Sequence, residues 1–389
     1  MGWFSGAPKV NTDERAVDEL LTRGVMEAVP RELAVQKLRS GNQLRVYLGV
    51  DPTGAKLHLG HSVPLRKLKA FADLGHHVIF LVGSFTAMVG DPTGRDTARE
   101  PLNREQVEKN FKTYKAQASK ILDFSKVELR YNHEWLEKMQ FADIMKLASN
   151  FTVQQMLERD MFRERIKREE DLSPNEFLYP LMQGYDSVML DVDCEIGGND
   201  QLFNMLAGRK LQKAFGKREK FVLTTKLIEG TDGRKMSKTY DNAVYLDDVP
   251  TEMYGKLMSI KDELVPTYFE TLTDVPMAEV AEILKSHPKE AKQRLAKEIV
   301  ALYHGKGAAE KAEAGFMKPD DAVSITIMKG QKLRDIAQQL QLSMSEMRRL
   351  VDQGAIEVVG GKKLSAIDAP LMNTTLKIGK HRFIKIVVK

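Results

Sequence analysis

The stretch that decides the fold is residues 46–83, VYLGVDPTGAKLHLGHSVPLRKLKAFADLGHHVIFLVG. It begins with a short apolar run over 46–50 that suits a buried strand, and the turn sequence DPTG follows at 51–54. Apolar residues then recur at helical spacing over 57–74, and a second apolar run occupies 77–83. A strand, a turn, a helix and a second strand form a βαβ unit, which predicts a parallel α/β sheet.

Further segments precede and follow this unit. Residues 12–40 are predicted to be helical, and residues 97–178 are long, charged and helical in pattern, so we expect them to form a helical insertion within the α/β domain. The apolar strand pattern returns over 187–192 and over 221–223. A helix is predicted between these two strands, over 200–215.

The remainder of the chain differs in its predicted secondary structure. Residues 250–320 are helical by pattern, with Pro288 at a plausible first helical position, and the run 306–313 is either a linker or a short exposed helix. From residue 324 onward we expect two short helices at 333–336 and 344–350 and strands at 355–359, 360–364 and 383–388. The predicted domains are therefore 1–245, 246–322 and 323–389.

Composition limits the class of protein. The 389 residues are 42% hydrophobic and 29% charged, as in an ordinary globular chain of two or three domains. Cys194 is the only cysteine, and no Cys/His cluster predicts a zinc site. No segment approaches the ~20 apolar residues needed to span a bilayer, and residues 1–6 lack a signal-peptide pattern, so we expect a cytoplasmic protein without a membrane partner.

The net charge of +5 is unevenly distributed. Residues 321–389 carry 12 Lys and Arg against 6 Asp and Glu, a net +6, so the preceding 320 residues carry −1. A basic C-terminal module is typical of a protein that binds a polyanion. A solvated basic face without a ligand would account for the charge about as well.

Two short motifs indicate nucleotide chemistry. His58-Leu59-Gly60-His61 opens the first predicted helix, where unpaired backbone N–H groups attract anions and where a glycine allows a nucleotide to approach closely. The loop Lys235-Met236-Ser237-Lys238-Thr239 carries two ammonium groups that could neutralise charge on a pyrophosphate. Either motif alone is more often a solvated surface segment. The sequence contains neither a Walker A motif nor G-x-G-x-x-G.

In this order and in one α/β domain, the pair resembles the HIGH and KMSKS motifs of class I aminoacyl-tRNA synthetases, with Leu59 where that family often has Ile and with a final Thr239. From about residue 30 to 389 the chain is similar to the tyrosyl-tRNA synthetase family. The stretches that carry this resemblance are YLGVDPTG at 47–54, TAMVGDPTG at 86–94, YPLMQGYD at 179–186 and IGGNDQ at 196–201. The resemblance implies a Rossmann-like catalytic domain over 1–245. Residues 1–10 do not resemble the family and are expected to be disordered.

The resemblance also implies roles for single residues. For the substrate tyrosine, it implies that Tyr47 and Asp186 bind the phenol oxygen. The ammonium group would be bound by Asp91, Tyr179 and Gln183, and the carboxylate would lie near Gln201. A phenol needs an acceptor for its proton and a donor to its oxygen, which Asp186 and Tyr47 can provide. Phenylalanine would leave both groups buried and unpaired, so we expect no editing domain.

For ATP, the resemblance implies contacts to the phosphates, the ribose and the departing pyrophosphate. The implied residues are Asp51 through its backbone, Thr53, His58, Gly60, His61, Gly198, Asp200, Lys235, Lys238 and Thr239. The expected catalytic residues are Thr53, His58, His61, Lys235, Lys238 and Thr239. Mg²⁺ is expected with ATP, although no dedicated carboxylate cage is visible in the sequence.

The C-terminal module resembles an S4 RNA-binding domain, and residues 246–322 would form a helical domain on the anticodon side of tRNA. The candidates for phosphate contacts are Arg348, Arg349, Lys362 and Lys363. The implied partner is tRNA(Tyr), and the helical insertion is expected to form a homodimer interface. Two alternatives stay open: an enzyme of the same fold that charges tryptophan or another aromatic residue, and a non-enzymatic RNA-binding paralogue.

Overall fold

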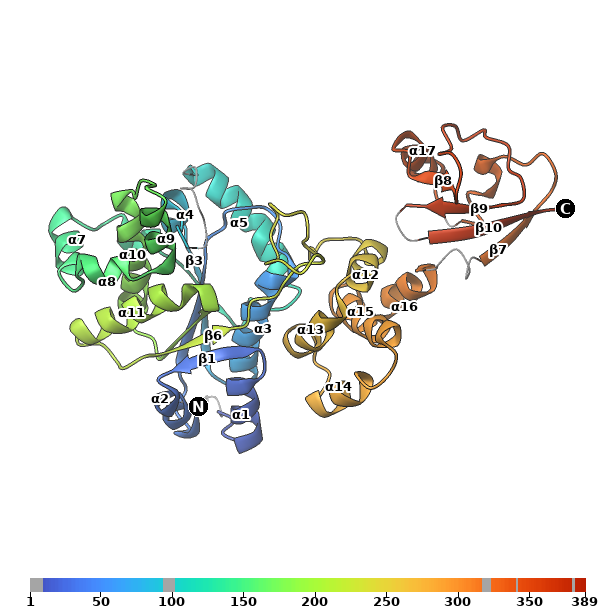
Figure 1. The fold of residues 1–389 in the computed structure, drawn as a ribbon. Helices are drawn as coiled ribbons and strands as arrows, with labels where there is room; N and C mark the ends of the chain where they lie inside the picture. The colour runs from blue at the N-terminus through green and yellow to red at the C-terminus, as the bar shows by residue number, and fades with distance from the viewer. Residues whose placement is uncertain (1–9, 94–101, 317–322, 341, 380–381) are drawn as a thin grey trace, which may run out of the picture. The chain divides into compact units, whose positions relative to one another are not determined.

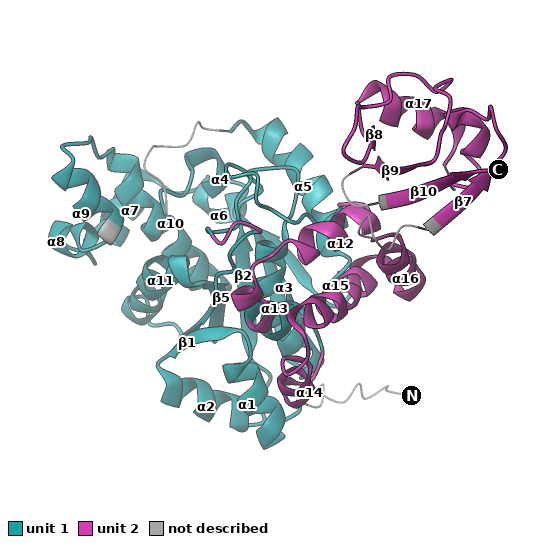
Figure 2. Cartoon of the chain, turned by 45° about the vertical axis from the view of Figure 1, so that its right-hand side comes forward, with its two compact units in different colours: residues 1–230, 234–247, 267–274 teal, residues 231–233, 248–266, 275–389 magenta. Residues whose placement is uncertain are grey.

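The computed structural model describes residues 10–93, 102–316, 323–340, 342–379 and 382–389. The expectation of disorder over 1–10 therefore falls almost entirely outside the described residues. The chain forms two compact units, coloured separately in Figure 2. The first contains residues 1–230, 234–247 and 267–274, and the second contains 231–233, 248–266 and 275–389.

The first unit is built on a six-stranded sheet in the order β1-β6-β5-β2-β3-β4. Its strands are β1 (Val25–Val29), β2 (Arg45–Val50), β3 (His77–Val82), β4 (Glu128–Tyr131), β5 (Cys194–Gly198) and β6 (Phe221–Thr225). All neighbouring strands are parallel except β1, which pairs antiparallel with β6 at the edge. The parallel α/β sheet predicted from the sequence is confirmed for β2 to β6, whereas the antiparallel edge strand β1 was not predicted.

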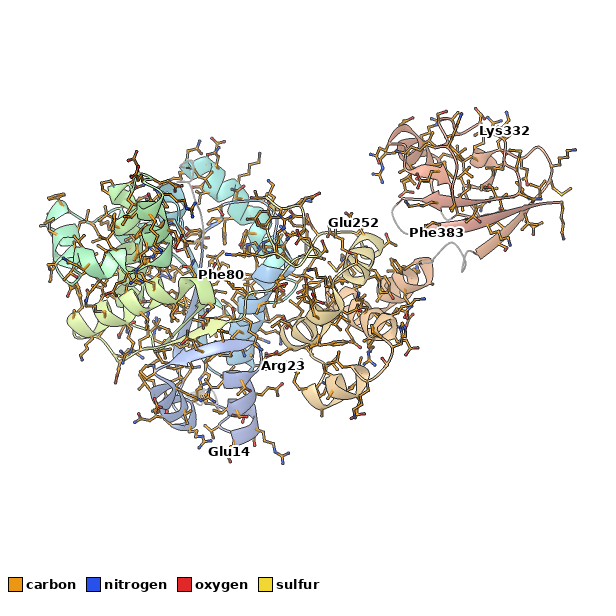
Figure 3. All side chains as sticks on the ribbon, viewed as in Figure 1. Glu14, Arg23, Phe80, Glu252, Lys332 and Phe383 are labelled. Atoms are coloured by element: carbon orange, nitrogen blue, oxygen red, sulfur yellow. The ribbon has the colours of Figure 1, made fainter. Side chains whose placement is uncertain are left out.

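Helices cover the sheet on both faces (Figure 1). Helix α3 (Leu59–Asp73) connects β2 to β3, as the opening motif predicts, and lies with α5 (Arg104–Ala118) on one side. Helices α10 (Pro174–Leu190) and α11 (Leu202–Ala214) lie on the other side. The interior is apolar, and Phe80 of β3, labelled in Figure 3, is fully buried with its ring near those of Phe111 and Phe124.

The strand order locates the functional edge of the sheet. The chain moves from β2 outward to β3 and β4, and then returns across the sheet to place β5 against the other side of β2. Such a reversal leaves a crevice at the carboxyl ends of the two central strands, and ligands of open α/β sheets bind there. The turn that follows β2 and the loop that follows β5 both open into this crevice.

Three sequence predictions for this unit are wrong. The segment 12–40 contains strand β1 between helices α1 (Glu14–Thr22) and α2 (Arg31–Arg39). The run 187–192 is not a strand: residues 187–190 are the last turn of α10, in which Ser187, Val188 and Leu190 are buried. A short apolar run of this kind does not distinguish a buried helix from a buried strand. Within 97–178, residues 128–131 form the edge strand β4.

The rest of that segment is helical, as predicted. After α5, its helices are α6 (His133–Leu136), α7 (Phe141–Ala148), α8 (Val153–Leu157) and α9 (Asp160–Lys167). A short helix, α4 (Thr86–Val89), follows β3. Residues 97–101 lie outside the described part of the chain.

The described residues between 250 and 316 are largely helical, as predicted. The helices are α12 (Pro250–Met258), α13 (Val265–Leu272), α14 (Met277–Ile283), α15 (Pro288–His304) and α16 (Lys306–Gly315). Pro288 is at the first position of α15, and Gly305 ends that helix with a φ of 87°, which a glycine adopts without strain. The run 306–313 is therefore a helix rather than a linker.

Residues 323–389 contain a second sheet, in the order β7-β10-β9-β8. Its strands are β7 (Val323–Ile327), β8 (Ile356–Val358), β9 (Thr374–Ile378) and β10 (Arg382–Val388), with α17 (Met344–Asp352) packed through Met347 onto their core. The helices predicted at 333–336 and 344–350 are present, the first as a 3-10 turn. The predicted strand at 360–364 is a turn followed by a single antiparallel bridge between Lys363 and Glu357. Strands β7 and β9 were not predicted.

Candidate active site

A cavity of about 1050 Å³ opens at the carboxyl ends of β2 and β5, entirely within the first unit. It brings together residues from 47 to 245 that the sequence places far apart. Of the residues expected to bind tyrosine or ATP, the cavity wall contains Tyr47, Asp51, Thr53, His58, His61, Asp91, Tyr179, Gln183, Asp186, Gly198, Asp200, Gln201, Lys235, Lys238 and Thr239. Gly60, the neighbour of His61 in the same helix turn, is the position where an added Cβ atom would come within 2.9 Å of the His58 ring.

Asp186 on α10 lines the cavity and has two hydrogen-bonding partners. Its two carboxylate oxygens accept hydrogen bonds from the Trp135 indole N–H at 2.8 Å and from the Asn132 side-chain amide at 3.2 Å. Burial raises the pKa of Asp186 well above its usual range. Asn132 and Trp135 were missed in the sequence because they follow β4, the strand that was itself missed.

Tyr47 on β2 is fully buried, and its hydroxyl lies 2.9 Å from the Ser187 hydroxyl on α10. Ser187 in turn contacts a buried ion pair between Lys220 and Glu195. Burial lowers the pKa of Lys220, and the adjacent carboxylate opposes that effect. Sequence reasoning assigned no role to these three residues, because nothing in their local pattern distinguishes them from other core positions.

The residues expected to bind an ammonium group are divided between two carboxylates. Asp91 accepts hydrogen bonds from the Gln201 amide at 2.7 Å and from the Thr93 backbone at 2.9 Å. The Tyr179 hydroxyl instead donates to Asp51 at 2.8 Å, and burial raises the pKa of this phenol. Both carboxylates line the cavity and could accept hydrogen bonds from a substrate cation.

Gln183 has a different partner from the one expected. Its amide donates to Glu195 at 3.0 Å, so in this structure it extends the polar group beneath Tyr47. Its position on the cavity wall still allows its carbonyl oxygen to face a ligand.

His58 and His61 lie at the start of α3 with ring centroids 3.8 Å apart. The His58 backbone N–H donates to Nδ1 of His61 at 3.2 Å. Burial lowers the pKa of His58 to about 2 and that of His61 to about 4. Both imidazoles are therefore neutral near pH 7, and they can offer N–H donors but no full positive charge to a phosphate.

The loop 235–239 borders the same cavity. The Lys235 ammonium lies 2.8 Å from Asp200, which follows β5. Lys238 and Thr239 also lie on the cavity wall. The two motifs that are separated by about 180 residues in sequence thus line one cavity, which Asp200 also lines.

The four basic candidates of the C-terminal module are exposed. Arg348 and Arg349 lie on α17, and Lys362 and Lys363 lie in the turn after β8. Among the described residues, no group of three or more His, Cys, Asp and Glu side chains is arranged to hold a metal ion. No helix in the described ranges is both long and apolar enough to cross a membrane.

Comparison with known proteins places these features in context. Residues 39–318 match the model of the family described as tRNA synthetases class I (W and Y). The chain is 43% identical to a tyrosine–tRNA ligase of Thermotoga maritima, over 95% of this chain and 96% of that one. It is 44% identical to a tyrosine–tRNA ligase of Carboxydothermus hydrogenoformans, over 95% and 97% of the two chains.

Solved structures give the same result for about three quarters of the chain. A C-terminally truncated mitochondrial tyrosyl-tRNA synthetase of Aspergillus nidulans is similar with a TM-score of 0.64 at 26% identity, over 77% of this chain and 92% of that one. The corresponding enzyme of Coccidioides posadasii gives a TM-score of 0.62 at 27% identity, over 77% and 91%.

Proposed function

The chain belongs to the class I tyrosyl-tRNA synthetases, and on this premise we propose that it activates tyrosine with ATP in the 1050 Å³ cavity and then transfers the tyrosyl group to tRNA(Tyr). The observation that carries the proposal is that His58, His61, Lys235 and Lys238 line the same cavity as Tyr47 and Asp186. Candidate phosphate ligands and candidate phenol ligands in one cavity fit a reaction between ATP and tyrosine.

In the first step, the tyrosine carboxylate attacks the α-phosphorus of ATP in line. The bond to the β-phosphate oxygen breaks, and tyrosyl-adenylate and pyrophosphate form. In the second step, the 2′- or 3′-hydroxyl of the terminal adenosine of tRNA attacks the acyl carbon, and AMP leaves. Neither step needs a nucleophile from the protein, so catalysis consists of positioning and charge stabilisation.

For tyrosine, we assign Asp186 and Tyr47 to the phenol oxygen and Asp91 to the ammonium group. Asp186 suits this role because Asn132 and Trp135 already fix its orientation. Tyr179 and Gln183 complete the ammonium site, and Tyr179 acts through the Asp51 carboxylate to which it donates. Gln201, which donates to Asp91, lies beside the carboxylate of the substrate.

For ATP, we assign Asp200 and Gly198 to the ribose and the start of α3 to the phosphates. Thr53, the Asp51 backbone, His58 and His61 would contact the nucleotide there, and Gly60 would keep the helix start open. Lys235, Lys238 and Thr239 would stabilise the pyrophosphate as it departs. Mg²⁺ would be bound together with the ATP substrate.

For tRNA, we assign the helical region 246–322 to the anticodon side and the module 323–389 to an S4-like contact with the phosphate backbone. The four exposed basic residues of the module support this assignment. Phosphate contacts position a nucleic acid without reading its sequence. The compartment we propose is the cytoplasm, where ATP and tRNA are supplied.

We also propose a homodimer that forms through the helical insertion. Phe141 and Met145, one turn apart on α7, are 77% and 55% exposed, and Val153 on α8 is 66% exposed. An apolar face of this kind is typical of a surface that another protein covers. Phe141→Glu is expected to convert a dimer to a monomer in sedimentation analysis, whereas Met277→Glu on α14 serves as a control that leaves the mass unchanged.

The activity is tested by ATP–pyrophosphate exchange with tyrosine, tryptophan, phenylalanine or no amino acid. Exchange that depends on tyrosine alone would support both the activation step and the pocket assignment. Exchange with tryptophan would keep the reaction and overturn the substrate. Folded protein that binds tRNA but exchanges with no amino acid would favour an RNA-binding role instead.

A further inference from the structure

Asn242 lies just after the loop 235–239 and contacts the backbone of that loop with a buried side chain, which is 2% exposed. Its Oδ1 atom accepts a hydrogen bond from the Ser237 backbone N–H at 2.9 Å. Its Nδ2 atom donates to the backbone carbonyl oxygens of Arg234 and Lys235 at 3.3 and 3.2 Å. One side-chain amide therefore bonds to three backbone groups at the start of the loop.

The surrounding chain has a shape that admits this amide. A Cβ atom on Gly230 would come within 2.4 Å of the Cγ atom of Asn242, so a glycine at this position leaves room for the side chain. Asp241 has a φ of 51°, a left-handed conformation that residues with a side chain rarely adopt, and its N–H donates to the Lys238 carbonyl at 3.2 Å. Such backbone strain is concentrated at functional sites.

The segment that follows Asn242 pairs with the start of α3. The Leu59 backbone N–H donates to the Val244 carbonyl at 2.9 Å, and His58 forms an antiparallel bridge with Tyr245. Val244 is fully buried, so this pairing belongs to the core of the unit. Only a few residues therefore separate the amide that holds the loop from the backbone that holds the two histidines.

The loop has little apolar packing of its own. Within the described residues 235–239, Met236 alone is buried. A segment with few buried contacts opens easily, so its position depends on the hydrogen bonds that hold it. Asn242 contacts only the backbone of the loop, and the Lys235 side chain can therefore leave Asp200 without breaking these contacts.

We propose that Asn242 is a positioning residue for tyrosine activation: it holds the backbone of the loop so that the Lys235 and Lys238 ammonium groups reach the departing pyrophosphate. This inference rests on the proposed function. Charges stabilise a transition state most effectively when the protein already holds them in place. Loss of the amide should therefore slow the chemical step and leave the affinity for tyrosine almost unchanged.

Two variants of the full chain test this role. Asn242→Ala removes all three contacts, whereas Asn242→Ser keeps a hydroxyl that replaces only part of them. In single-turnover rapid-quench measurements, we expect tyrosyl-adenylate formation to slow about tenfold in Asn242→Ala and about threefold in Asn242→Ser. Equilibrium dialysis should show that the tyrosine Kd changes less than twofold in both.

A double-mutant cycle shows whether Asn242 acts through the two lysines. In the Lys235→Ala/Lys238→Ala protein, Asn242→Ala should slow adenylate formation less than twofold further, because the groups that it positions are absent. A further tenfold loss in this background would show that the amide supports the site in another way, and it would overturn the inference.

Trypsin measures the position of the loop without any need for activity. This protease cleaves after lysine and arginine, and Lys235 and Lys238 are both exposed. Cleavage of a folded protein follows the population of the opened segment. We expect Asn242→Ala to raise the cleavage rate within the loop about fivefold, and an unchanged rate would show that the amide does not hold the loop.

Gln212→Ala is the matched control. Gln212 on α11 is also a fully buried amide, and its Nε2 atom donates to the backbone carbonyls of Val192 and Arg218 at 3.0 and 2.9 Å. None of these three residues lines the cavity. The variant should lower the melting temperature and leave both the rate of adenylate formation and the cleavage of the loop unchanged.

The results separate this inference from the proposed function. If the folded Asn242 variants, or Asn242→Ser alone where Asn242→Ala does not fold, form adenylate within twofold of the normal rate, the amide has only a structural role and the inference fails. Lack of tyrosine-dependent adenylate formation by the unsubstituted protein would instead overturn the proposed function.

Discussion

Lys235 and Lys238 occupy one loop but differ in their surroundings. Lys235 is paired with Asp200, the residue we assign to the ribose, whereas Lys238 lines the cavity two residues before Tyr240. Binding of ATP would therefore have to replace the Lys235 contact with Asp200 by a ribose hydroxyl. The freed ammonium group is then available to the phosphates.

Lys238→Ala is predicted to slow tyrosine activation about a hundredfold and to change tyrosine affinity less than threefold. The reason is that a charge aimed at the departing pyrophosphate acts mainly in the transition state, and loss of one such group typically costs ~2.7–4 kcal/mol. Rapid-quench measurement of adenylate formation and equilibrium dialysis with tyrosine give the two quantities. Comparable losses in both would contradict the assigned role.

The neutral histidines predict a dependence of stability on pH. The pKa of His61 is lowered to about 4 in the folded protein, below the ordinary value of 6.5, so the unfolded chain binds more protons as the pH falls. The contribution of the neutral His61 to the free energy of unfolding is therefore fully present above pH ~6.5 and is lost as the pH falls toward 4. Between pH 7.5 and 5, this one residue accounts for up to about 2 kcal/mol of the free energy of unfolding.

His61→Gln should remove that part of the decline, because a glutamine oxygen can still accept from the His58 backbone but does not titrate. Urea unfolding at pH 7.5 and pH 5 measures the effect. The unsubstituted protein is expected to lose more stability than the variant over this interval. An equal loss would show that His61 is not kept neutral by burial.

Among helices and strands, those with a complete local pattern were predictable and those defined by distant partners were not. The unit β2–α3–β3 follows from residues 46–83 alone, because each of its elements shows its own period and a turn separates the first two. Strand β4 has only four residues, all partly buried, and it is identified by its pairing with β3 rather than by its composition.

The same distinction applies to the site. The residues of the two motifs could be identified from the sequence because each motif is a continuous segment, one at a turn and one in a loop. Their hydrogen-bond partners could not be identified, because those partners come from distant segments that only the fold brings together. Tyr179 donates to Asp51, 128 positions away in sequence, and Asp186 is oriented by Asn132 and Trp135. The buried Lys220 has no sequence pattern that separates it from a surface lysine.

Helices α10 and α11 cross closely at Gly184 and Gly208. A Cβ atom on Gly208 would come within 2.5 Å of the Ser187 hydroxyl and 2.6 Å of the Lys220 ammonium. Gly208→Ala is therefore predicted to destabilise the protein by about 1–3 kcal/mol, in the range typical of overpacked cores. Chemical denaturation measures this, and Gly216→Ser, where nothing lies within 4 Å of the added atom but φ is 64°, separates crowding from backbone strain.

On the scale of the whole molecule, activation and tRNA charging should be separable. The proposed activation site lies within the first unit, whereas Arg348 and Arg349 belong to the second. Arg348→Ala/Arg349→Ala is predicted to leave tyrosine-dependent exchange unchanged and to lower kcat/KM for tRNA about tenfold. The slope of log affinity against log salt should fall by ~0.7–0.9 for each phosphate that the variant no longer neutralises.

Aminoacylation and filter binding at several salt concentrations provide these values. Lys126→Ala, a surface substitution in the first unit, is the control for a simple loss of positive charge. Equal tRNA affinity in the double variant and the unsubstituted protein would remove the C-terminal module from the tRNA-binding surface.

The position of β5 between β2 and β6 also governs how the protein can be made. Strands β2 and β3 can pair soon after they leave the ribosome, but the other edge of β2 has no partner until residues 51–193 have been synthesised. At ~5–20 residues per second, that delay is roughly 7–30 s. During this interval an apolar strand edge is open to pairing with other chains. Slow translation or high expression should therefore increase aggregation of nascent chains, and a chaperone that shields the β2 edge should reduce it.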